Sequence, residues 1–491
     1  MRREILYSSD EGESWAALIE DGQLVEVSVE RFAGSSGEPL AVGDIHTGIV
    51  RRILPGMQAA FVEVAGERTV FLHARDVWLE PEEEEEDGEA AAAPPDISSL
   101  LHEGQRVLVQ IAKEALPHKG ARATLHVSIP DRLLVYGPSQ AHAGVSRRIV
   151  DPAERARLRE AILSFARPGE GFIARTAAEG APVERLLSSA ETLRALWRDV
   201  ESAARAASGP ELVRREEDLL GRILRDLVPN EPVEILVEGE GAHERCLDAL
   251  AALEVPSVAT VSRHSGPAPL FEERGIWAEV ERSLRPRIRL RGGGTIVITQ
   301  TEALVAVDVN TSRSVAGQTP EQTALGADLE AAREIARQLR LRDLGGIIVI
   351  DFIDLEEEAS RRELSEALGA ELARDRAHTR VLEISPFGLV QLTRKRARAS
   401  LDRELLEDCA FCGGSGRVKS AQTLMREIRR ALRSRVASGR RQAATVSLQP
   451  ADARRLRDAG LSLAGVSGLP ERVEVKEDPA LPPGRFEILT E

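Results

Sequence analysis

Two stretches of sequence decide the fold of this chain: LVAVDVN at residues 304–310 and IIVIDFID at residues 347–354. Each is rich in β-branched residues and is almost wholly apolar until it reaches an aspartate, Asp308 in the first and Asp351 in the second. Short apolar runs of this kind are typical of strands covered on both faces of a parallel sheet. We therefore predict two buried strands, each ending at an acid.

The segment between the two strands predicts an α-helix from Thr319 to Arg342. Thr319 stands at the N-cap, Pro320 takes the first helical position, Gln322 completes a capping box, and two glycines follow the helix end. A strand, a helix and a second strand form a right-handed crossover that leaves the strands parallel. Both carboxylates would then lie at the same edge of the sheet, where open α/β sheets bind ligands.

The two aspartates predict a metal site. Carboxylates brought together from neighbouring strands repel each other unless a cation lies between them, and a hard divalent ion, most simply Mg²⁺, would satisfy both. A single aspartate at a strand end is often only a turn former or an N-cap. Two such acids, with Asn310 two residues beyond Asp308, favour a magnesium site at Asp308 and Asp351.

Size and composition limit the class of protein. A chain of 491 residues is long enough for several domains. Its three cysteines, Cys246, Cys409 and Cys412, are too few for a disulfide scaffold. The sequence has no apolar run of membrane-spanning length, and its first residues lack the apolar core of a signal peptide. We expect a cytoplasmic protein.

The net charge of −15 hides a basic region. Residues 79–96 contain nine acids and no base, whereas residues 394–441 contain fourteen Arg or Lys and five acids. Local charge of this kind can serve a nucleic-acid partner even when the whole chain is acidic. For the arginines between residues 426 and 435, a solvated helix face is the simpler interpretation.

The first 128 residues predict β-structure. Residues 1–36 form a meander that must pack on a distant segment, and residues 221–283 are the candidate partner. Residues 38–128 contain five short strands and suit an OB-type barrel, interrupted by a disordered acidic loop at 79–96. Aromatic side chains and cations of such barrels hold single-stranded nucleic acid. The candidates are Phe61, Phe71, Lys113 and Lys119, although either ring could instead belong to the core.

The segment CAFCGGSG at residues 409–416 has the form of a zinc knuckle. A structural zinc ion needs four ligands, and this segment supplies two, Cys409 and Cys412. The same pair from a second subunit would complete a Cys₄ site across a two-fold axis. A redox dithiol and an unliganded pair are the alternatives.

The chain resembles the ribonuclease E/G family of endoribonucleases from bacteria and plastids. The resemblance covers roughly residues 1–420 and rests on three motifs: TEALVAVDVN at 301–310, EIARQLRLRDLGG at 334–346 and IDFID at 350–354. It implies an α/β multidomain fold with a ribonuclease H-like subdomain in two parts (1–37 and 221–283), an inserted OB-fold, S1-like RNA-binding domain (38–128), a 5′ sensor region (129–220), a deoxyribonuclease I-like catalytic domain (284–400), a zinc link (401–417) and a small C-terminal α/β domain (418–491).

The resemblance also implies roles for single residues. Asp308 and Asp351 match the positions that hold catalytic Mg²⁺, and Asn310 matches a position that supports them. Further positions are implied to contact RNA (Phe61, Phe71 and Lys119), to share Zn²⁺ between protomers (Cys409 and Cys412) and to bind a 5′-monophosphate (Val135, Arg147, Arg175 and Thr176).

Two residues depart from the family's 5′ pocket. Asp131 stands where a glycine is usual, and His378 stands where an arginine can complete the pocket; Arg376 or Arg380 is the candidate to compensate. The chain also lacks a long C-terminal scaffold and therefore resembles the shorter, ribonuclease G branch.

The expected activity is Mg²⁺-dependent hydrolysis of single-stranded RNA to 5′-phosphate and 3′-hydroxyl ends, in rRNA and tRNA processing and mRNA decay. The expected assembly is a homodimer or a dimer of dimers, with rRNA precursors and mRNA as partners. The alternatives are a non-catalytic RNA-binding or assembly protein and a phosphomonoesterase on the same metal site.

Overall fold

In the computed structural model the chain forms two compact units, Met1–Glu404 and Leu405–Glu491. The structure describes residues 2–10, 12–31, 40–78, 94–115, 120–228, 230–253, 258–311, 319–382, 384–385, 388–396, 398–410, 412, 414, 416–437, 443–463, 466 and 468–490. Lys119 and most of the predicted acidic loop lie outside these ranges. No helix within them is long and apolar enough to cross a membrane.

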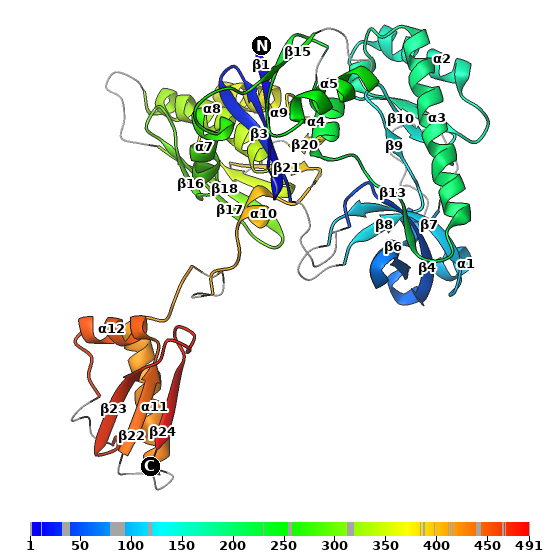
Figure 1. Ribbon diagram of the computed structural model, residues 1–491. Helices are drawn as coiled ribbons and strands as arrows, with labels where there is room; N and C mark the ends of the chain where they lie inside the picture. The colour runs from blue at the N-terminus through cyan, green and yellow to red at the C-terminus, as the bar shows by residue number, and fades with distance from the viewer. Residues whose placement is uncertain are drawn as a thin grey trace. The chain divides into compact units, whose positions relative to one another are not determined.

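The first sheet joins the two ends of a long insertion. Its five strands have the order β15-β14-β1-β2-β3, and β1 runs parallel to β14 with Arg3 opposite Val233. The N-terminal meander thus pairs with a segment more than 200 residues later, and their apolar residues share one core. Figure 1 labels most of its elements, which are β1 (Arg3–Ser9), β2 (Glu13–Glu20), β3 (Gln23–Arg31), α4 (Leu219–Leu227), β14 (Val233–Glu238), α5 (Ala242–Ala252), β15 (Ala259–Arg263), α6 (Leu270–Glu273) and α7 (Ile276–Ser283).

A closed barrel of five strands follows. The strands have the order β4-β5-β6-β8-β7, pairing of β4 with β7 closes the ring, and β13 adds to β4 from outside. This closed barrel is consistent with the OB-type prediction. Its elements are β4 (Ile45–Leu54), η1 (Pro55–Met57), β5 (Ala59–Val64), η2 (Ala65–Glu67), β6 (Arg68–His73), η3 (Ala74–Asp76), α1 (Ile97–Leu100), β7 (Arg106–Lys113), β8 (Arg122–Thr124) and β13 (Glu211–Arg214).

A small four-stranded sheet, ordered β11-β12-β10-β9, and two helices form the next layer. The long helix α3 and the shorter α2 share one buried cluster with these strands. The elements are β9 (Ile129–Pro130), β10 (Leu134–Gly137), β11 (Ala143–Val145), α2 (Pro152–Phe165), β12 (Gly171–Ala174), η4 (Thr176–Ala178) and α3 (Val183–Ala206).

The two stretches that opened the sequence form the centre of a six-stranded sheet, ordered β16-β17-β18-β19-β21-β20. As predicted, β18 and β19 are parallel, and the helix between them has Thr319 at its N-cap and a capping box with Gln322. The elements are β16 (Arg287–Arg289), β17 (Thr295–Gln300), β18 (Leu304–Asn310), α8 (Pro320–Leu341), β19 (Gly346–Asp351), α9 (Glu358–Leu372), β20 (Thr379–Val381), β21 (Leu389–Arg394) and α10 (Leu401–Leu405).

The prediction that both central strands are buried on two faces is wrong. Along β18 the buried residues alternate with exposed ones, and Ile347 at the start of β19 is 53% exposed. Helices α8 and α9 and the core residues of the sheet form one buried cluster on a single face. The nearly continuous apolar sequence did not indicate that one face of the sheet is open. This open face carries Asp308 and Asp351.

Buried charge joins the six-stranded sheet to the N-terminal sheet. Arg340 of α8 is 8% exposed and donates hydrogen bonds to Glu20 and Glu26, each over 2.9 Å. An arginine buried at this depth is tolerated because it has carboxylate partners. These ion pairs anchor α8 against the strands β2 and β3.

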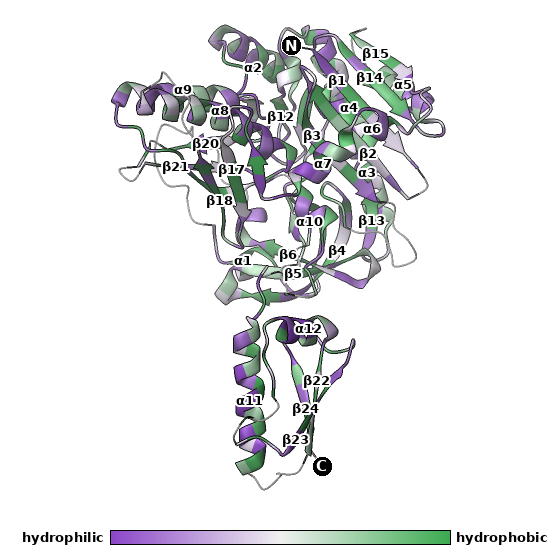
Figure 2. Ribbon diagram, turned by 90° about the vertical axis from the view of Figure 1, so that its left-hand side faces the viewer, coloured by the Kyte–Doolittle hydropathy of each residue, from purple (hydrophilic) through white to green (hydrophobic). Residues whose placement is uncertain are grey.

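The second unit is a small α/β fold. Its three strands have the order β23-β22-β24, and the apolar residues of two helices pack with them in one cluster. Hydrophobic and hydrophilic residues alternate along α11, as the colours of Figure 2 show, because one face of the helix is buried and the other is open. The elements are α11 (Ala421–Ala437), β22 (Ala443–Leu448), α12 (Pro450–Asp458), β23 (Arg472–Glu477) and β24 (Phe486–Thr490).

Candidate functional site

The two aspartates stand side by side on the open face. Asp308 and Asp351 are register partners at the ends of the parallel strands β18 and β19, and both side chains are exposed. Backbones of neighbouring strands lie about 4.8 Å apart, and register partners carry their side chains on the same face. Two anionic groups therefore meet at one edge of the sheet, as the crossover predicted.

The third predicted residue orients one of these acids. Asn310 Nδ2 donates a hydrogen bond to Asp308 Oδ2 over 2.7 Å. The bond fixes one carboxylate oxygen and leaves the other able to bind a cation. Within the described residues no three His, Cys, Asp or Glu gather around a common point. The two carboxylates nevertheless fit Mg²⁺, which takes one or two acids and completes its shell with water and substrate phosphate.

A further acid, missed in the sequence, lies behind this edge. Asp328 of α8 is fully buried and accepts a hydrogen bond over 3.1 Å from the backbone N–H of Ile353, two residues beyond Asp351. Burial and the nearby charge of Asp354 raise the pKa of Asp328 to about 7. The sequence held a signal, because Asp328 interrupts the apolar stripe of an otherwise ordinary amphipathic helix.

Two arginines share the open face with the aspartates, and the sequence analysis missed both. Val297 pairs with Asp308 on one side and with Arg287 on the other, so Arg287 stands two strands from the acid in the same row. Arg289 occupies the row of Asn310 in the same way. Two strand spacings make about 10 Å between backbones, a separation that leaves room for a phosphate between guanidinium and carboxylate.

The two barrel phenylalanines lie together. Phe61 and Phe71 are register partners on β5 and β6, with ring centroids 6.1 Å apart and ring planes at 72°. Both are half-buried, while their strand neighbours fill the barrel interior. The rings therefore lie on the outer side of the barrel wall, where a base can reach them.

Two arginines flank this aromatic pair in the same row across the barrel. The row follows from strand register. Arg52 pairs with Phe61, and Arg122 pairs with Phe71, so one row across the barrel reads Arg52, Phe61, Phe71, Arg122. Arg52 is exposed, whereas Arg122 forms an ion pair with Asp76 over 2.7 Å. Lys113 is exposed at the end of β7.

Four residues of the predicted 5′ pocket lie near the ends of the small sheet. Val135 is half-buried on β10, and Thr176 begins η4, two residues beyond the end of β12. The hydroxyl of Thr176 lies 3.2 Å from that of Ser146, which brings exposed Arg147 to the same place. Arg175 donates to the Asp131 carbonyl and to Asp226 Oδ1, each over 2.6 Å.

The two departures from the family pocket have different structural consequences. The Asp131 carboxylate accepts a hydrogen bond from Ser189 over 2.5 Å and is held there. His378 is exposed, and Arg376 donates to the backbone carbonyl of Asp226 over 3.2 Å. Arg175 thus contacts the carboxylate of Asp226, whereas Arg376 contacts only its backbone carbonyl and forms its ion pair with Glu26.

Asp226 limits how freely this cluster can bind an anion. Burial opposes its ionisation, but hydrogen bonds from Arg225 and the charge of Arg175 lower the pKa of Asp226. The carboxylate is therefore charged at neutral pH and already neutralises part of the arginine charge. A phosphate bound here must compete with it.

Two hydrogen bonds from backbone N–H groups connect described residues of the cysteine segment. Cys409 is exposed and Cys412 half-buried, and neither forms a disulfide. The Cys412 N–H donates to the Cys409 carbonyl over 3.2 Å, and the Gly416 N–H donates to the Cys412 sulfur over 3.2 Å. Backbone donors aimed at sulfur stabilise a thiolate, so this segment fits half of a zinc site.

Comparison with known proteins identifies the family of this chain. The profile of the ribonuclease E/G family matches residues 128–397. Ribonuclease G of Salmonella typhimurium is 37% identical over 430 residues, which cover 88% of this chain and 87% of the relative. Ribonuclease G of Haemophilus influenzae is 38% identical over 87% of this chain and 86% of its own length.

Ribonuclease E of Escherichia coli is 34% identical over 432 residues, which cover 88% of this chain and 40% of that protein. The match with ribonuclease G thus extends over most of both chains, whereas ribonuclease E contains a large part with no counterpart here. By its family profile and by these identities, this chain belongs to the ribonuclease E/G family and is ribonuclease G-like.

Proposed function

We propose that this enzyme, an endoribonuclease by its family, cleaves single-stranded RNA by hydrolysis at a magnesium centre formed by Asp308 and Asp351. The observation that carries the proposal is the register of the two acids, which lie directly opposite each other on an open face. An ion bound there supplies Lewis-acid chemistry: it polarises the scissile phosphate and makes water a better nucleophile. Hydrolysis by water leaves 5′-phosphate and 3′-hydroxyl ends.

The chain's own residues position the reactants. Asn310 holds the Asp308 carboxylate through its 2.7 Å hydrogen bond. Asp328 holds the turn beyond Asp351 through the Ile353 N–H. Arg287 and Arg289, in the rows of the acids, would bind the non-bridging oxygens of a phosphate and keep the strand across the open face.

The barrel would supply affinity that does not depend on sequence. Bases can stack on Phe61 and Phe71, and Arg52 beside them can bind the phosphate backbone. Lys113 and Lys119 add charge in the same domain. Binding of this kind weakens steeply as salt rises.

The domain names and assembly belong to the same proposal. We assign a ribonuclease H-like subdomain, an S1-like barrel, a 5′ sensor, a deoxyribonuclease I-like catalytic domain, a zinc link and a small C-terminal domain to the ranges given above. The thiols of Cys409 and Cys412 would bind Zn²⁺ together with the same pair from a second protomer, in a dimer or a dimer of dimers. The substrates would be rRNA and tRNA precursors and mRNA.

One assay tests the activity. A 5′-labelled, A/U-rich single strand is incubated with the protein with and without Mg²⁺, and the products are sized and their ends identified. We expect internal cleavage only with Mg²⁺ and none by Asp308→Asn, which should still bind RNA. Binding without cleavage by the unmodified chain would favour a non-catalytic RNA-binding protein, and phosphate release from small esters a phosphomonoesterase.

The same strand with a 5′-monophosphate or a 5′-triphosphate tests the sensor pocket. Because Asp226 already neutralises Arg175, we expect a smaller preference for the monophosphate than an unoccupied arginine would give. Asp226→Asn should increase that preference. Equal rates on both ends, in the unmodified chain and in Asp226→Asn, would contradict a sensor at this place.

A further inference from the structure

The second unit differs in charge from the rest of the chain. Residues 405–491 contain fifteen Arg or Lys and eleven Asp or Glu, whereas the whole chain has a net charge of −15. Five of these arginines lie on α11, which has a single acid, Glu427. Positive charge is thus concentrated on one helix of an otherwise acidic protein.

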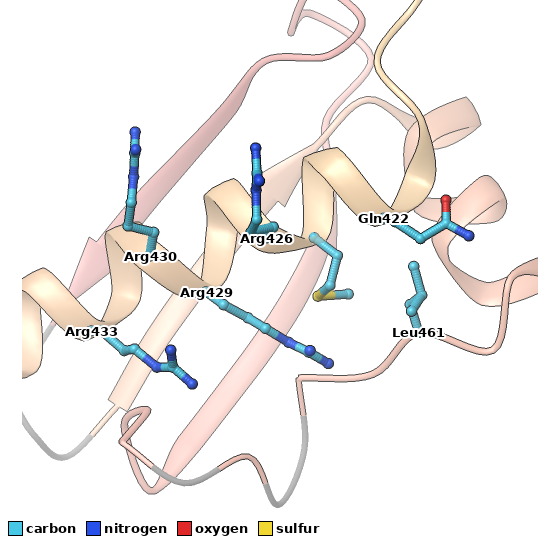
Figure 3. A pocket seen from close by; sticks show the side chains of 7 residues that line it. Gln422, Arg426, Arg429, Arg430, Arg433 and Leu461 are labelled. Carbon is cyan, nitrogen blue, oxygen red and sulfur yellow. The ribbon is translucent and has the colours of Figure 1, made fainter.

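The helix separates its arginines from its core. Its apolar side is buried in the unit, and its other side carries Arg426, Arg429, Arg430 and Arg433, at intervals of three and four residues. Arg426 and Arg430 extend in one direction and Arg429 and Arg433 in another, so the charge covers a broad strip (Figure 3). The apolar residues that pack the helix are Leu424, Met425, Ile428 and Leu432.

These arginines line a concave site. A cavity of about 530 Å³ is bounded by the four arginines, by Gln422 and by two apolar side chains, Met425 and Leu461. No carboxylate is among these lining residues. Arg429 is held in the wall because its Nη2 donates to the Ser462 carbonyl over 2.8 Å, and Figure 3 shows it reaching toward Leu461.

Other arginines of the unit have structural partners. Arg455 pairs with Asp452 and Arg457 with Glu477, each over 2.8 Å, and Arg435 donates to the Ile488 carbonyl. Glu427 pairs with Lys419 over 2.6 Å. Within the described residues, no hydrogen bond or ion pair engages the side chains of Arg426, Arg430 and Arg433, and all three are exposed. Their charge is available to a ligand.

We propose that the arginine strip of α11 and its cavity form a second RNA-binding site, which holds the phosphates of a single strand while the half-buried Leu461 faces a base. The proposal rests on the proposed function, because RNA is the polyanion on which the enzyme would act. A guanidinium group can bind two phosphate oxygens at once through parallel hydrogen bonds. The apolar floor of the cavity can contact the face of a base. A solvated helix face explains the exposure but not the concave, acid-free lining.

The test compares two triple variants of the full chain in the Asp308→Asn background, without added Mg²⁺. Arg426→Gln, Arg430→Gln and Arg433→Gln remove the strip. Arg454→Gln, Arg457→Gln and Arg472→Gln remove the same charge from exposed positions of the same unit. Affinity for a labelled A/U-rich 15-mer RNA, a length of about 15 nucleotides that one OB-type site can hold, is measured between low and physiological salt.

At physiological salt, the strip variant should bind the RNA about tenfold more weakly or worse. The slope of log K against log [salt] should become less negative by about two, because three phosphate contacts are lost and each contributes about 0.7 to the slope. The control should bind like the parent. Replacing the same three residues by Lys should restore most of the salt dependence. Equal curves for strip and control variants would overturn the proposal, and thermal melting shows whether all variants fold alike.

An acidic protein segment is the competing ligand. A Glu-rich peptide of matched charge is titrated in parallel, and the proposal requires weaker binding of the peptide, because it offers no bases to the apolar floor. Equal or tighter binding of the peptide would contradict an RNA site. RNA cleavage by the unmodified chain with Mg²⁺ is measured in a separate assay. Failure of the second binding site can therefore be distinguished from failure of the proposed activity.

Discussion

The open and the covered face of the six-stranded sheet use aspartate in opposite ways. On the open face Asp308 and Asp351 are exposed and stand side by side, whereas on the covered face Asp328 is fully buried and its pKa is raised to about 7. Water and a bound cation can stabilise the first pair as anions, but the apolar layer cannot do so for the third acid. The comparison shows that the face of the sheet, rather than the residue type, decides whether an acid is open to solvent and to ligands.

Replacement of an open-face acid should have the largest effect. Asp308→Asn or Asp351→Asn should lower the rate of RNA cleavage about a thousandfold or more, because several kcal/mol of metal-dependent transition-state stabilisation would be lost. Cleavage of the labelled strand in saturating Mg²⁺ measures this. Glu366→Gln is the matched control: it removes an exposed acid of α9, the helix on the covered face of the sheet, and should remain active. Retained activity in both aspartate variants would remove the acids from the mechanism.

On the covered face, a substitution in α8 should lower the stability of the fold rather than the rate of cleavage. Arg340→Met removes the arginine that Glu20 and Glu26 share, while Arg3, Arg374 and Arg376 still contact these acids. The loss of charge-assisted hydrogen bonds should cost about 1.5–3 kcal/mol in the free energy of unfolding. Urea unfolding followed by fluorescence measures the loss. Arg333→Met changes an arginine of the same helix that is 66% exposed, and it should cost less than about 1 kcal/mol. Equal midpoints for the two variants would show that the buried ion pairs do not anchor α8.

Asp328 predicts a pH dependence of stability. The folded pKa is about 7 and the ordinary value is 3.8, so between these values the folded chain holds a proton that the unfolded chain has released. Stability should therefore fall as pH rises from about 4 to about 7, by up to about 1.4 kcal/mol per pH unit. Asp328→Asn should remove this contribution and stabilise the protein at pH 8 by about 1–3 kcal/mol.

Melting curves of the parent and of Asp328→Asn at pH 5 and pH 8 decide this point. The asparagine can still accept the hydrogen bond from Ile353, so cleavage activity at pH 8 should be retained. A variant that melts below the parent at both pH values would mean that the buried carboxyl is needed in its present form. The contrast between the two faces would then be weaker than proposed.

Arg287 should give the smallest effect. Arg287→Ala removes one phosphate contact from the open face, so kcat/KM should fall about fivefold to twentyfold, mostly through KM, in line with about 1–2 kcal/mol for one charge-assisted hydrogen bond. Arg291→Ala, an exposed arginine in the turn after the same strand, is the control. A loss confined to kcat with unchanged KM would instead place Arg287 at the reacting phosphate.

Local signals in the sequence were sufficient to predict much of the six-stranded sheet. The capping box at Thr319, the parallel pairing of β18 with β19 and the adjacency of Asp308 and Asp351 all follow from short-range chemistry and the handedness of the crossover. The motifs around the two acids were enough to identify the ribonuclease E/G family. These features depend on residues close in sequence or on one connection rule.

Only the tertiary structure decided which surfaces are open. Apolar sequence predicted two buried strands, yet the helices cover one face, because burial depends on which layers pack against a sheet and not on its composition. The rows that place Arg287 beside Asp308 and Arg52 beside Phe61 arise from strand register between segments distant in the chain. The sequence by itself thus determined the acids and their sheet, and the packing of layers determined what lies beside them and what RNA can reach.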